Sequence, residues 1–324
     1  MRASATAIAY FAFARPIHTE ASIASLRANH GAQEMPLYIF ADAARSPDEA
    51  QRVGAVRDIL NRVEGFKAIT RIYREHNLGC AQSIIDGIGR VLGAYERVIV
   101  VEDDLLLSPH FLSFVRRGLA VYANRQDVFS VCAASPPPEL LSLPQHYPHD
   151  VYLSPRMSPC GWGTWRDRWD QVDWSMEDYN AFRISPGRHW RLSRGGNDLV
   201  PMLHAQMSGR IDAWDIRFNY AQIMARKYSL YPRFPYVQNL GMDGSGTHSR
   251  PSDYCEVDLD KVQASPGMPP DLEPAKEVLR AVKLHHDEPM LSTLLGLVPG
   301  TRWAVRSIKH YLGINRPLLK RKQF

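Results

Sequence analysis

The stretch RVIVVEDDLLLSPHF, residues 97–111, passes from an apolar run straight into three acids and then returns to apolar residues. Its first part, Arg97–Val101, is rich in β-branched side chains, which predicts a buried strand. Glu102, Asp103 and Asp104 follow at the carboxyl end of that strand. Because the strand fixes where these acids stand, their position indicates a use for the charge.

Strands and helices alternate around this stretch, from the N-terminus to about residue 122. The helix over residues 20–29 is predicted to start from a Thr19 cap. This alternation predicts an α/β fold with a mostly parallel sheet flanked by helices. The predicted strands are Ala7–Ala14, Pro36–Ala41, Ala68–Tyr73 and Arg97–Val101, and the predicted helices are Glu20–Asn29, Pro47–Arg62, Cys80–Tyr95 and Pro109–Tyr122.

Polar residues follow three of these strands at the same end. Arg15 comes after the first strand, Asp42 after the second, and the acid triplet after the fourth. Ligands of open parallel sheets bind at the carboxyl ends of the strands, so these side chains are expected to line one crevice.

The second half of the chain is less regular and rich in tryptophan. Trp162, Trp165 and Trp169 are spaced as on one face of a helix, which favours a packing role; a platform for a sugar acceptor is the alternative. Farther on, residues 212–248 read as a helix, a short strand and a glycine-rich loop ending in Thr247 and His248.

Composition describes a folded protein with a basic end. The chain has 324 residues, 45% hydrophobic and 23% charged, which suits one large α/β domain or two modest ones. Residues 289–324 hold seven Lys/Arg and no acid, while the net charge of the whole chain is +5, so the remainder sums to −2. An anionic membrane surface, or simply a solvated terminus, suits this tail; no basic, aromatic-interleaved patch in the body indicates nucleic acid.

The cysteines and the N-terminal segment bear on the cellular compartment. The four cysteines form no CxxC or zinc-like pattern, so free thiols of a reducing compartment are expected. The N-terminal MRASATAIAYFAFARP resembles a weak signal peptide, but the first buried strand is favoured because the alternation starts there. No apolar run is long enough to predict a transmembrane helix.

The acid triplet has three readings: a solvated strand end, a hard-cation site, or paired carboxylates for acid–base catalysis. Carboxylate oxygens suit Mg²⁺ and Mn²⁺, which usually keep substrate phosphates among their ligands. The buried strand before the acids favours the cation, because a metal held there can neutralise a diphosphate.

These motifs resemble a known family. The stretch VIVVEDDLLLSPHFLSFV (98–115) looks like the metal-binding segment of metal-dependent GT-A glycosyltransferases of the N-acetylglucosaminyltransferase I family. The order SPCGWGTW, AWDIR, NLGMDGSGTH is similar to the downstream order in that family and in bacterial glycosyltransferases of surface-polysaccharide loci. The resemblance covers about residues 5–250 and not the basic tail.

The resemblance implies roles for residues around the acid triplet. Asp104 would ligate Mn²⁺ or Mg²⁺, Asp103 would hold the ribose hydroxyls, and Glu102 would shape the strand end. Arg15 would contact the nucleotide, and Asp42 would face the uracil edge.

Outside the triplet, the resemblance implies three more sites. Asp215, which follows Trp214, would be the catalytic base, with Asp212 as its competitor. Thr247 and His248 would lie on a loop that closes over the donor. The segment HNLGCAQS (76–83) resembles the loop that cradles the donor through Asn77, although Asn77 and Gly79 could simply form a turn.

The sequence therefore predicts a cytoplasmic, inverting glycosyltransferase that uses a UDP-sugar, UDP-N-acetylglucosamine being a candidate, and a glycan or lipid-linked acceptor. The expected catalytic domain is 1–255, with a nucleotide-sugar half (about 1–125) and an acceptor half (about 126–255). Residues 256–324 form a partly helical C-terminal extension, basic from 289, which could contact the inner face of the plasma membrane. The alternatives are a sugar-nucleotide nucleotidyltransferase and a non-catalytic glycan-binding module.

Overall fold

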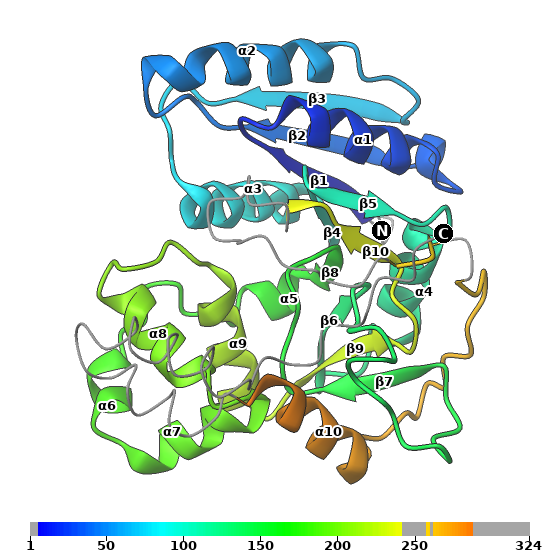
Figure 1. Cartoon of the computed structure of the whole chain (residues 1–324), viewed down its shortest axis with the longest axis vertical. Coiled ribbons are helices and arrows are strands. Elements are labelled where there is room, and N and C mark those ends of the chain that lie inside the picture. The colour runs from blue at the N-terminus through cyan, green and yellow to red at the C-terminus, as the bar shows by residue number, and fades with distance from the viewer. Residues whose placement is uncertain (1–5, 242–256, 260–261, 288–324) are drawn as a thin grey trace, which may run out of the picture.

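An eight-stranded sheet runs through the molecule in the order β3-β2-β1-β4-β8-β6-β9-β7, and a separate pair joins β10 to β5 (Figure 1). The computed structural model describes residues 6–241, 257–259 and 262–287. The strands are β1 (Thr6–Ala12), β2 (Pro36–Ala41), β3 (Ala68–Tyr73), β4 (Arg97–Glu102), β5 (Leu105–Leu107), β6 (Val128–Cys132), β7 (Val151–Ser154), β8 (Trp162–Trp165), β9 (Tyr228–Pro232) and β10 (Val237–Asn239).

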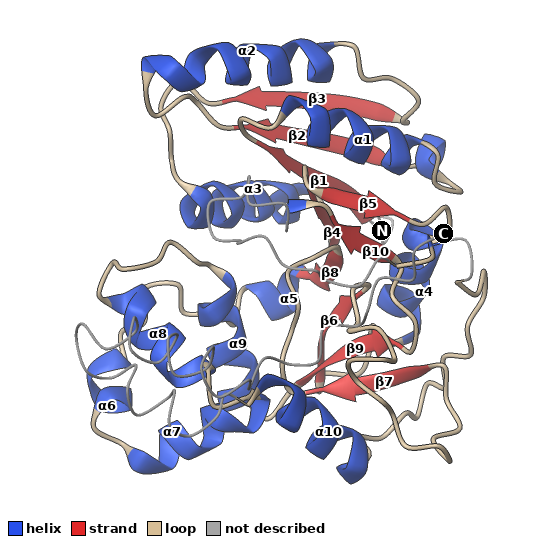
Figure 2. Cartoon of the chain, viewed as in Figure 1, coloured by secondary structure: helices blue, strands red, loops and turns tan. Residues whose placement is uncertain are grey.

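Helices cover both faces of this sheet (Figure 2). They are α1 (Pro16–Arg27), α2 (Pro47–Asn61), α3 (Cys80–Ala94), α4 (Phe111–Val121), α5 (Arg166–Trp169), α6 (Tyr179–Arg183), α7 (Pro186–Leu192), α8 (Leu199–Met207), α9 (Asp215–Met224) and α10 (Lys276–His286), with short 3₁₀ turns η1 (Ala32–Glu34) and η2 (Ser193–Gly195). None of the helices in the described ranges is both long and apolar enough to cross a bilayer.

The half of the sheet predicted from the sequence is parallel throughout. β1 pairs in parallel with β2 and with β4, and β2 pairs in parallel with β3. The other half is mixed: β8 runs antiparallel to β4 and β6, β6 and β9 are parallel, and β7 is antiparallel to β9. Four of the seven neighbouring pairs are parallel, so the α/β prediction is confirmed, and the antiparallel strands lie in the half where the sequence was irregular.

Two hydrophobic cores lie on opposite faces of the sheet. Side chains alternate along β1, so Ile8 and Tyr10 join the core under α1, α2 and α4, while Ala9 and Phe11 join the core under α3. Because helices cover both faces, β1 is buried on both sides, as its unbroken apolar run requires.

A helical lobe forms a third core. Helices α6, α7 and α8 bury their apolar side chains against one side of α9, including Ile216 and Tyr220. Phe218 and the preceding Trp214 belong instead to the core beneath the sheet. Helix α9 therefore joins the lobe to the sheet and holds its own first residue, Asp215, at their junction.

Two local predictions were wrong. Helix α1 begins at Pro16 rather than after a Thr19 cap, because proline suits the first helical turn; the Thr19 hydroxyl donates to the Arg15 carbonyl at 2.8 Å. Trp162 and Trp165 lie on strand β8 and only Trp169 on α5, so the helical spacing was misleading, although all three are buried.

Candidate active site

The acid triplet forms the turn that ends the central parallel strand. Glu102 closes β4 beside Phe11 of β1, and Asp103 and Asp104 turn the chain into β5. Strand β10 then pairs with β5, and the Leu240 amide donates to the Asp104 carbonyl at 2.7 Å. The acids are therefore held between two sheets by backbone hydrogen bonds.

Arg15 connects the two aspartates. One guanidinium nitrogen forms an ion pair with Asp103 and the other lies 3.0 Å from Asp104 Oδ2. The Phe13 amide also donates to Asp103 at 2.9 Å. The Asp103 side chain is 3% exposed and that of Asp104 is 15% exposed, so Asp104 is the more accessible to a ligand.

The electrostatics of this turn favour a bound positive charge. Burial, together with Asp104 and Asp103, raises the pKa of Glu102 to about 8. Burial also raises the pKa of Asp103, although Arg15 opposes this shift. The two aspartates raise the pKa of Arg15 even though burial lowers it. One guanidinium thus faces three crowded carboxyl groups, and a ligand that brings more positive charge would relieve their repulsion.

Asp42 and Asn77 lie at the same edge of the sheet, but their side chains form hydrogen bonds with backbone groups. The Asp42 carboxylate accepts hydrogen bonds from the amides of Ala43, Leu78 and Gly79 at 3.0–3.2 Å. Asn77 donates to the Ala43 carbonyl at 2.6 Å and accepts from Gly79. Gly79 has a φ of +77°, which glycine adopts without strain, so these residues build the turn into α3.

A first cavity, of about 320 Å³, opens at these strand ends. It brings together Arg15, Asp42, Asn77, Glu102 and Asp103, whereas Asp104, which was expected in the same crevice, does not line it. Further side chains in its wall were not assigned to this crevice from the sequence: Arg45, Glu49, Arg52, Cys80, Ser83 and Asp212.

Cys80 is the clearest residue that the sequence did not identify. It is exposed on the first turn of α3, and burial of its thiol together with Glu102, Asp212 and Asp215 raises its pKa. Asp212 Oδ2 lies 3.4 Å from the Ala81 amide, at the start of the same helix.

Asp215, the predicted base, lies at the start of α9. Trp214, the residue before it, stacks on Trp162 with ring centroids 5.0 Å apart. Asn219, one turn later, accepts from the Met157 amide at 2.7 Å and fixes α9 against the chain after β7. Asp215 is also among the groups that raise the pKa of Glu102.

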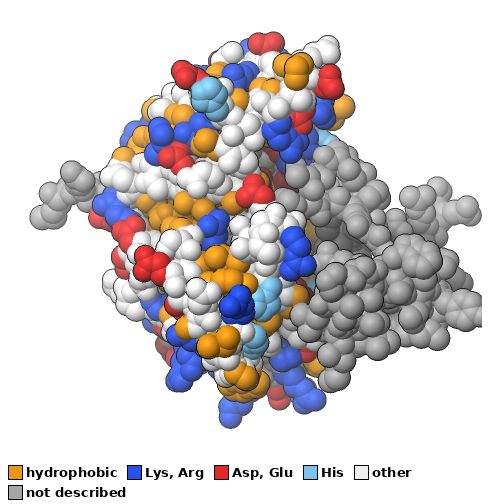
Figure 3. All heavy atoms as spheres, turned by 90° about the vertical axis from the view of Figure 1, so that its left-hand side faces the viewer, with side chains coloured by type: hydrophobic (Ala, Val, Ile, Leu, Met, Phe, Trp, Pro, Cys, Tyr) orange, Lys and Arg blue, Asp and Glu red, His pale blue; other side chains and the backbone are white. Residues whose placement is uncertain are grey.

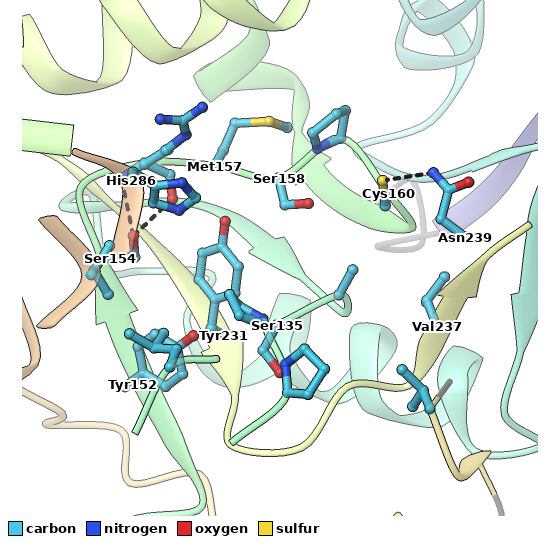
Figure 4. Close-up of a pocket in the computed structure, with 18 of the residues that line it drawn as sticks. Ser135, Tyr152, Ser154, Met157, Ser158, Cys160, Tyr231, Val237, Asn239 and His286 are labelled. Atoms are coloured by element: carbon cyan, nitrogen blue, oxygen red, sulfur yellow. Dashed lines mark hydrogen bonds between the residues drawn. The ribbon is translucent and has the colours of Figure 1, made fainter. Parts of the chain in front are cut away.

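Asp215 lines a second cavity, of about 250 Å³ (Figure 4). Hydroxyl groups and tyrosine rings lie among many apolar side chains in its wall: Tyr152 and Tyr231 stack at 5.4 Å, and the buried Ser135 hydroxyl has no hydrogen-bond partner among the described residues. The residues used below are Ser135, Tyr152, Arg156, Ser158, Tyr231, Asn239 and His286. His286 comes from α10, whose Val278 and Val282 pack into the core with β7, so the segment beyond residue 256 completes this cavity.

The charge of the second cavity is largely neutralised. Arg156 Nη1 lies 2.7 and 2.9 Å from the two carboxylate oxygens of Asp198. Asn239 donates to the Cys160 sulfur at 3.5 Å, as the dashed line in Figure 4 marks. The first cavity is thus rich in charge, whereas the second is rich in neutral hydrogen-bonding groups.

The acid turn offers hard oxygen ligands to a cation. A side chain at Gly241 would collide with the Asp104 carboxylate and lie 3.0 Å from Arg15 Nη1 and 3.1 Å from Asn239 Oδ1, so the Asp104 oxygen shares this point with the Arg15 guanidinium. Within the described ranges, no three His, Cys, Asp or Glu side chains form a complete metal site. One accessible carboxylate fits Mg²⁺ or Mn²⁺, which take few protein ligands when substrate phosphates supply the others.

Two sequence predictions fall outside the described residues. Thr247 and His248 lie in 242–256, and the basic tail lies in 288–324.

The chain is similar in fold to solved glycosyltransferase structures, at low identity. A mannosyltransferase from Pyrobaculum calidifontis in complex with GDP-Man and Mn²⁺ matches at 10% identity and a TM-score of 0.41, over 96% of this chain and 81% of that one. S. aureus TarS 1–349 matches at 10% identity and a TM-score of 0.39, over 73% of this chain and 61% of that one. No protein-family model and no curated protein matches the chain.

Proposed function

We propose that the chain is a metal-dependent, inverting GT-A glycosyltransferase that moves a sugar from a UDP-sugar to a glycan or lipid-linked acceptor. The observation that supports this proposal best is the group of charged side chains at the sheet edge. Arg15, Asp42, Glu102 and Asp103 line the first cavity there, and Asp215 lines the second. The choice of UDP, with UDP-N-acetylglucosamine as first candidate, rests on the resemblance of the acid stretch.

The first cavity suits the nucleotide diphosphate. Asp103 would accept the ribose hydroxyls, and Arg15 would exchange part of its contact with Asp104 for a phosphate oxygen. Asn77, Gly79 and Asp42 would fix the loop against which the base lies. When bound at Asp104, Mn²⁺ or Mg²⁺ would supply positive charge to the departing diphosphate.

The second cavity suits the acceptor. Asp215 would take the proton of the acceptor hydroxyl as that oxygen bonds to the anomeric carbon and the bond from this carbon to the diphosphate breaks. Its place at the N-terminus of α9 favours the ionised carboxylate that a base requires. Because the acids and Asp215 approach from different cavities, attack opposite the leaving group, and hence inversion, is supported.

The two alternatives fit less well. A nucleotidyltransferase would use a glycine-rich phosphate loop after β1, but that connection reads Phe13-Ala14-Arg15. A glycan-binding module would present a platform of several tryptophans, but Trp162, Trp165, Trp169 and Trp214 are at most 5% exposed, and Trp190, at 71%, offers a single ring. Neither alternative explains why both cavities contain carboxyl groups.

The cellular location of the protein is a further part of this proposal. We infer a cytoplasmic enzyme at the inner face of the plasma membrane, where the basic tail 289–324 meets anionic lipid. Its acceptor would then be a lipid-linked glycan. Thr247 and His248 are proposed to close over the donor.

A thermal-shift screen of the full chain tests the proposal. UDP, UDP-N-acetylglucosamine, other UDP-sugars and GDP-Man would each be added with Mn²⁺ or with EDTA; the mannosyltransferase named above justifies the last. A ligand at about 100 times its Kd stabilises the folded state by about 2.7 kcal/mol, so a clear rise in Tm is expected with UDP and Mn²⁺. A rise with GDP-Man alone would contradict UDP, and no rise with any nucleotide would overturn the function.

A further inference from the structure

The connection from α6 to α7 exposes large apolar side chains. Ile184 is 77% exposed and Trp190 is 71% exposed, and only Ile17, at 81%, exceeds them among the large hydrophobic residues that the structure describes. Burying apolar surface is favourable, so two such side chains six residues apart indicate a surface that becomes covered.

The same segment is strongly basic. Residues 183–194 contain Arg183, Arg188, Arg191 and Arg194 and no acid. Arg188 pairs with Asp178 at 2.7 Å, whereas the other three arginines form no ion pair within the part of the chain described. Three positive charges therefore remain uncompensated beside Ile184 and Trp190.

The lobe holds this segment in a fixed orientation. Phe182 and Leu192 are fully buried in the lobe core, and the Ser185 side chain accepts from the Arg188 amide to cap α7. Gly187, Trp190 and Arg194, which recur three and four residues apart, are exposed. In Figure 3, basic and hydrophobic side chains border one another over the lower half of this face, where the lobe lies.

We propose that this surface, formed by Arg183, Ile184, Trp190, Arg191 and Arg194, docks the lobe on a bilayer that contains anionic lipids. Tryptophan favours the boundary between headgroups and acyl chains, and a neighbouring isoleucine adds apolar contact there. The three arginines would lie at the level of the lipid phosphates. A phosphate-only ligand, such as nucleic acid, would use the arginines but would leave Ile184 in water.

The position of the lobe links this surface to the acceptor cavity. Asp198, at the start of α8, holds Arg156 of the second cavity, and Gly195 of η2 also lies within reach of Arg156. Docking the lobe would therefore bring the second cavity close to the membrane. The binding proposal itself does not depend on the proposed glycosyl transfer.

Co-sedimentation of the full chain with vesicles tests the surface. Vesicles of phosphatidylcholine alone are compared with vesicles that also contain phosphatidylglycerol. At about fivefold per arginine, R183Q/R191Q/R194Q should lose affinity for the anionic vesicles on the order of a hundredfold. The control R27Q/R62Q/K67Q removes the same charge from exposed positions elsewhere and should lose much less.

The apolar half of the surface has its own matched pair. Ile184→Ser should weaken vesicle binding several-fold, while Ile17→Ser, at an equally exposed position, should not. Quenching of tryptophan fluorescence by brominated acyl chains should fall in Trp190→Phe. Equal losses in both triple variants, or none in either, would overturn the proposal, as would a single-stranded oligonucleotide that binds at this surface while anionic vesicles do not.

Discussion

The two cavities are built from different parts of the molecule and carry different chemistry. The first lies at the carboxyl ends of β1, β2 and β4, and fixed charges define it. The second lies among β7, β9, α10 and the loops between them, and hydroxyl groups and tyrosine rings are set among apolar side chains in its wall. Charge is placed where a diphosphate would depart, and neutral hydrogen-bonding groups are placed where a sugar would bind.

Asp215 is the residue that would link the two cavities in the proposed reaction. It lines the second cavity, and it is among the groups that raise the pKa of Glu102 in the wall of the first. If each cavity serves one substrate, the largest effect should come from a change of the proposed base, and smaller, separable effects should come from changes elsewhere in either cavity.

Asp215→Asn is expected to give the largest loss. Removing a positioned general base costs about 10²–10⁴-fold in kcat. Affinity for the donor should barely change, because the Asp215 carboxylate does not contact the diphosphate. Initial rates of nucleotide release, with p-nitrophenyl glycosides as acceptors, separate this kcat effect from donor binding.

Asp212→Asn is the control for the base. Its carboxylate faces the start of α3 rather than the second cavity, so its effect on kcat should be mild. If Asp212→Asn abolishes transfer while Asp215→Asn is mild, Asp212 is the base and the assignment of the Trp-Asp segment is wrong.

Asp104→Asn should weaken binding of the metal and nucleotide beside the first cavity, where Asp104 pairs with Arg15. Loss of an outer-shell partner typically costs about 10–100-fold in metal affinity, and loss of the ligand itself should cost at least as much. Titration of UDP, with Mn²⁺ and with EDTA, should show that the metal-dependent part of the affinity is gone while the fold remains. Asp48→Asn, at an exposed acid of α2, is the matched control. If EDTA leaves the affinity of the wild-type chain for UDP unchanged, the proposed metal site is wrong.

The first cavity could be predicted from the sequence because the ends of the strands can be located from the sequence. Apolar runs and their spacing located β1 to β4, and parallel pairing then required Arg15, Asp42 and the acid triplet to share an edge. The contacts that each side chain makes could not be predicted from the sequence. The backbone contacts of Asp42, for example, depend on the turn at Gly79, which is set by tertiary packing.

The second cavity could not be predicted in the same way. Ser135, Tyr231 and His286 are common residue types, far apart in the chain and without a motif. They meet because the sheet changes to antiparallel pairing at β8 and because α10 returns to β7. The tryptophan spacing misled for a related reason: a strand followed by a short helix can imitate the period of one helix over a few residues.

The turn at Gly79 offers a stability test of the first cavity. A methyl group at this position would approach Asp212 Oδ2 to 2.8 Å, with the backbone at positive φ, so Gly79→Ala should destabilise the fold by about 1–3 kcal/mol. Gly54→Ala, in the middle of α2 with no atom within 4 Å of the added methyl, should instead stabilise by about 0.5–1 kcal/mol. Thermal unfolding of both variants measures the difference, and similar Tm shifts would show that the turn is not constrained as described.

Ser135→Ala should give the smallest effect and the sharpest separation between stability and function. The Ser135 side chain is almost fully buried, and its hydroxyl finds no hydrogen-bond partner within the described residues, so its removal should leave Tm unchanged or raise it. If that hydroxyl instead serves an acceptor sugar, KM for the acceptor should rise by about fivefold, the value of one hydrogen bond of about 1 kcal/mol.

Ser130→Ala supplies the opposite pattern for comparison. Its hydroxyl is bonded to the Ser229 hydroxyl at 2.7 Å inside the sheet, so this variant should lose about 1 kcal/mol of stability and keep its acceptor KM. The two serines differ in one respect that matters: one hydroxyl is satisfied within the protein and the other faces a cavity. A fall in Tm for Ser135→Ala with no change in acceptor KM would mean that the hydroxyl stabilises the fold and does not bind the acceptor. The proposal that the second cavity binds a sugar would then lack its most specific contact.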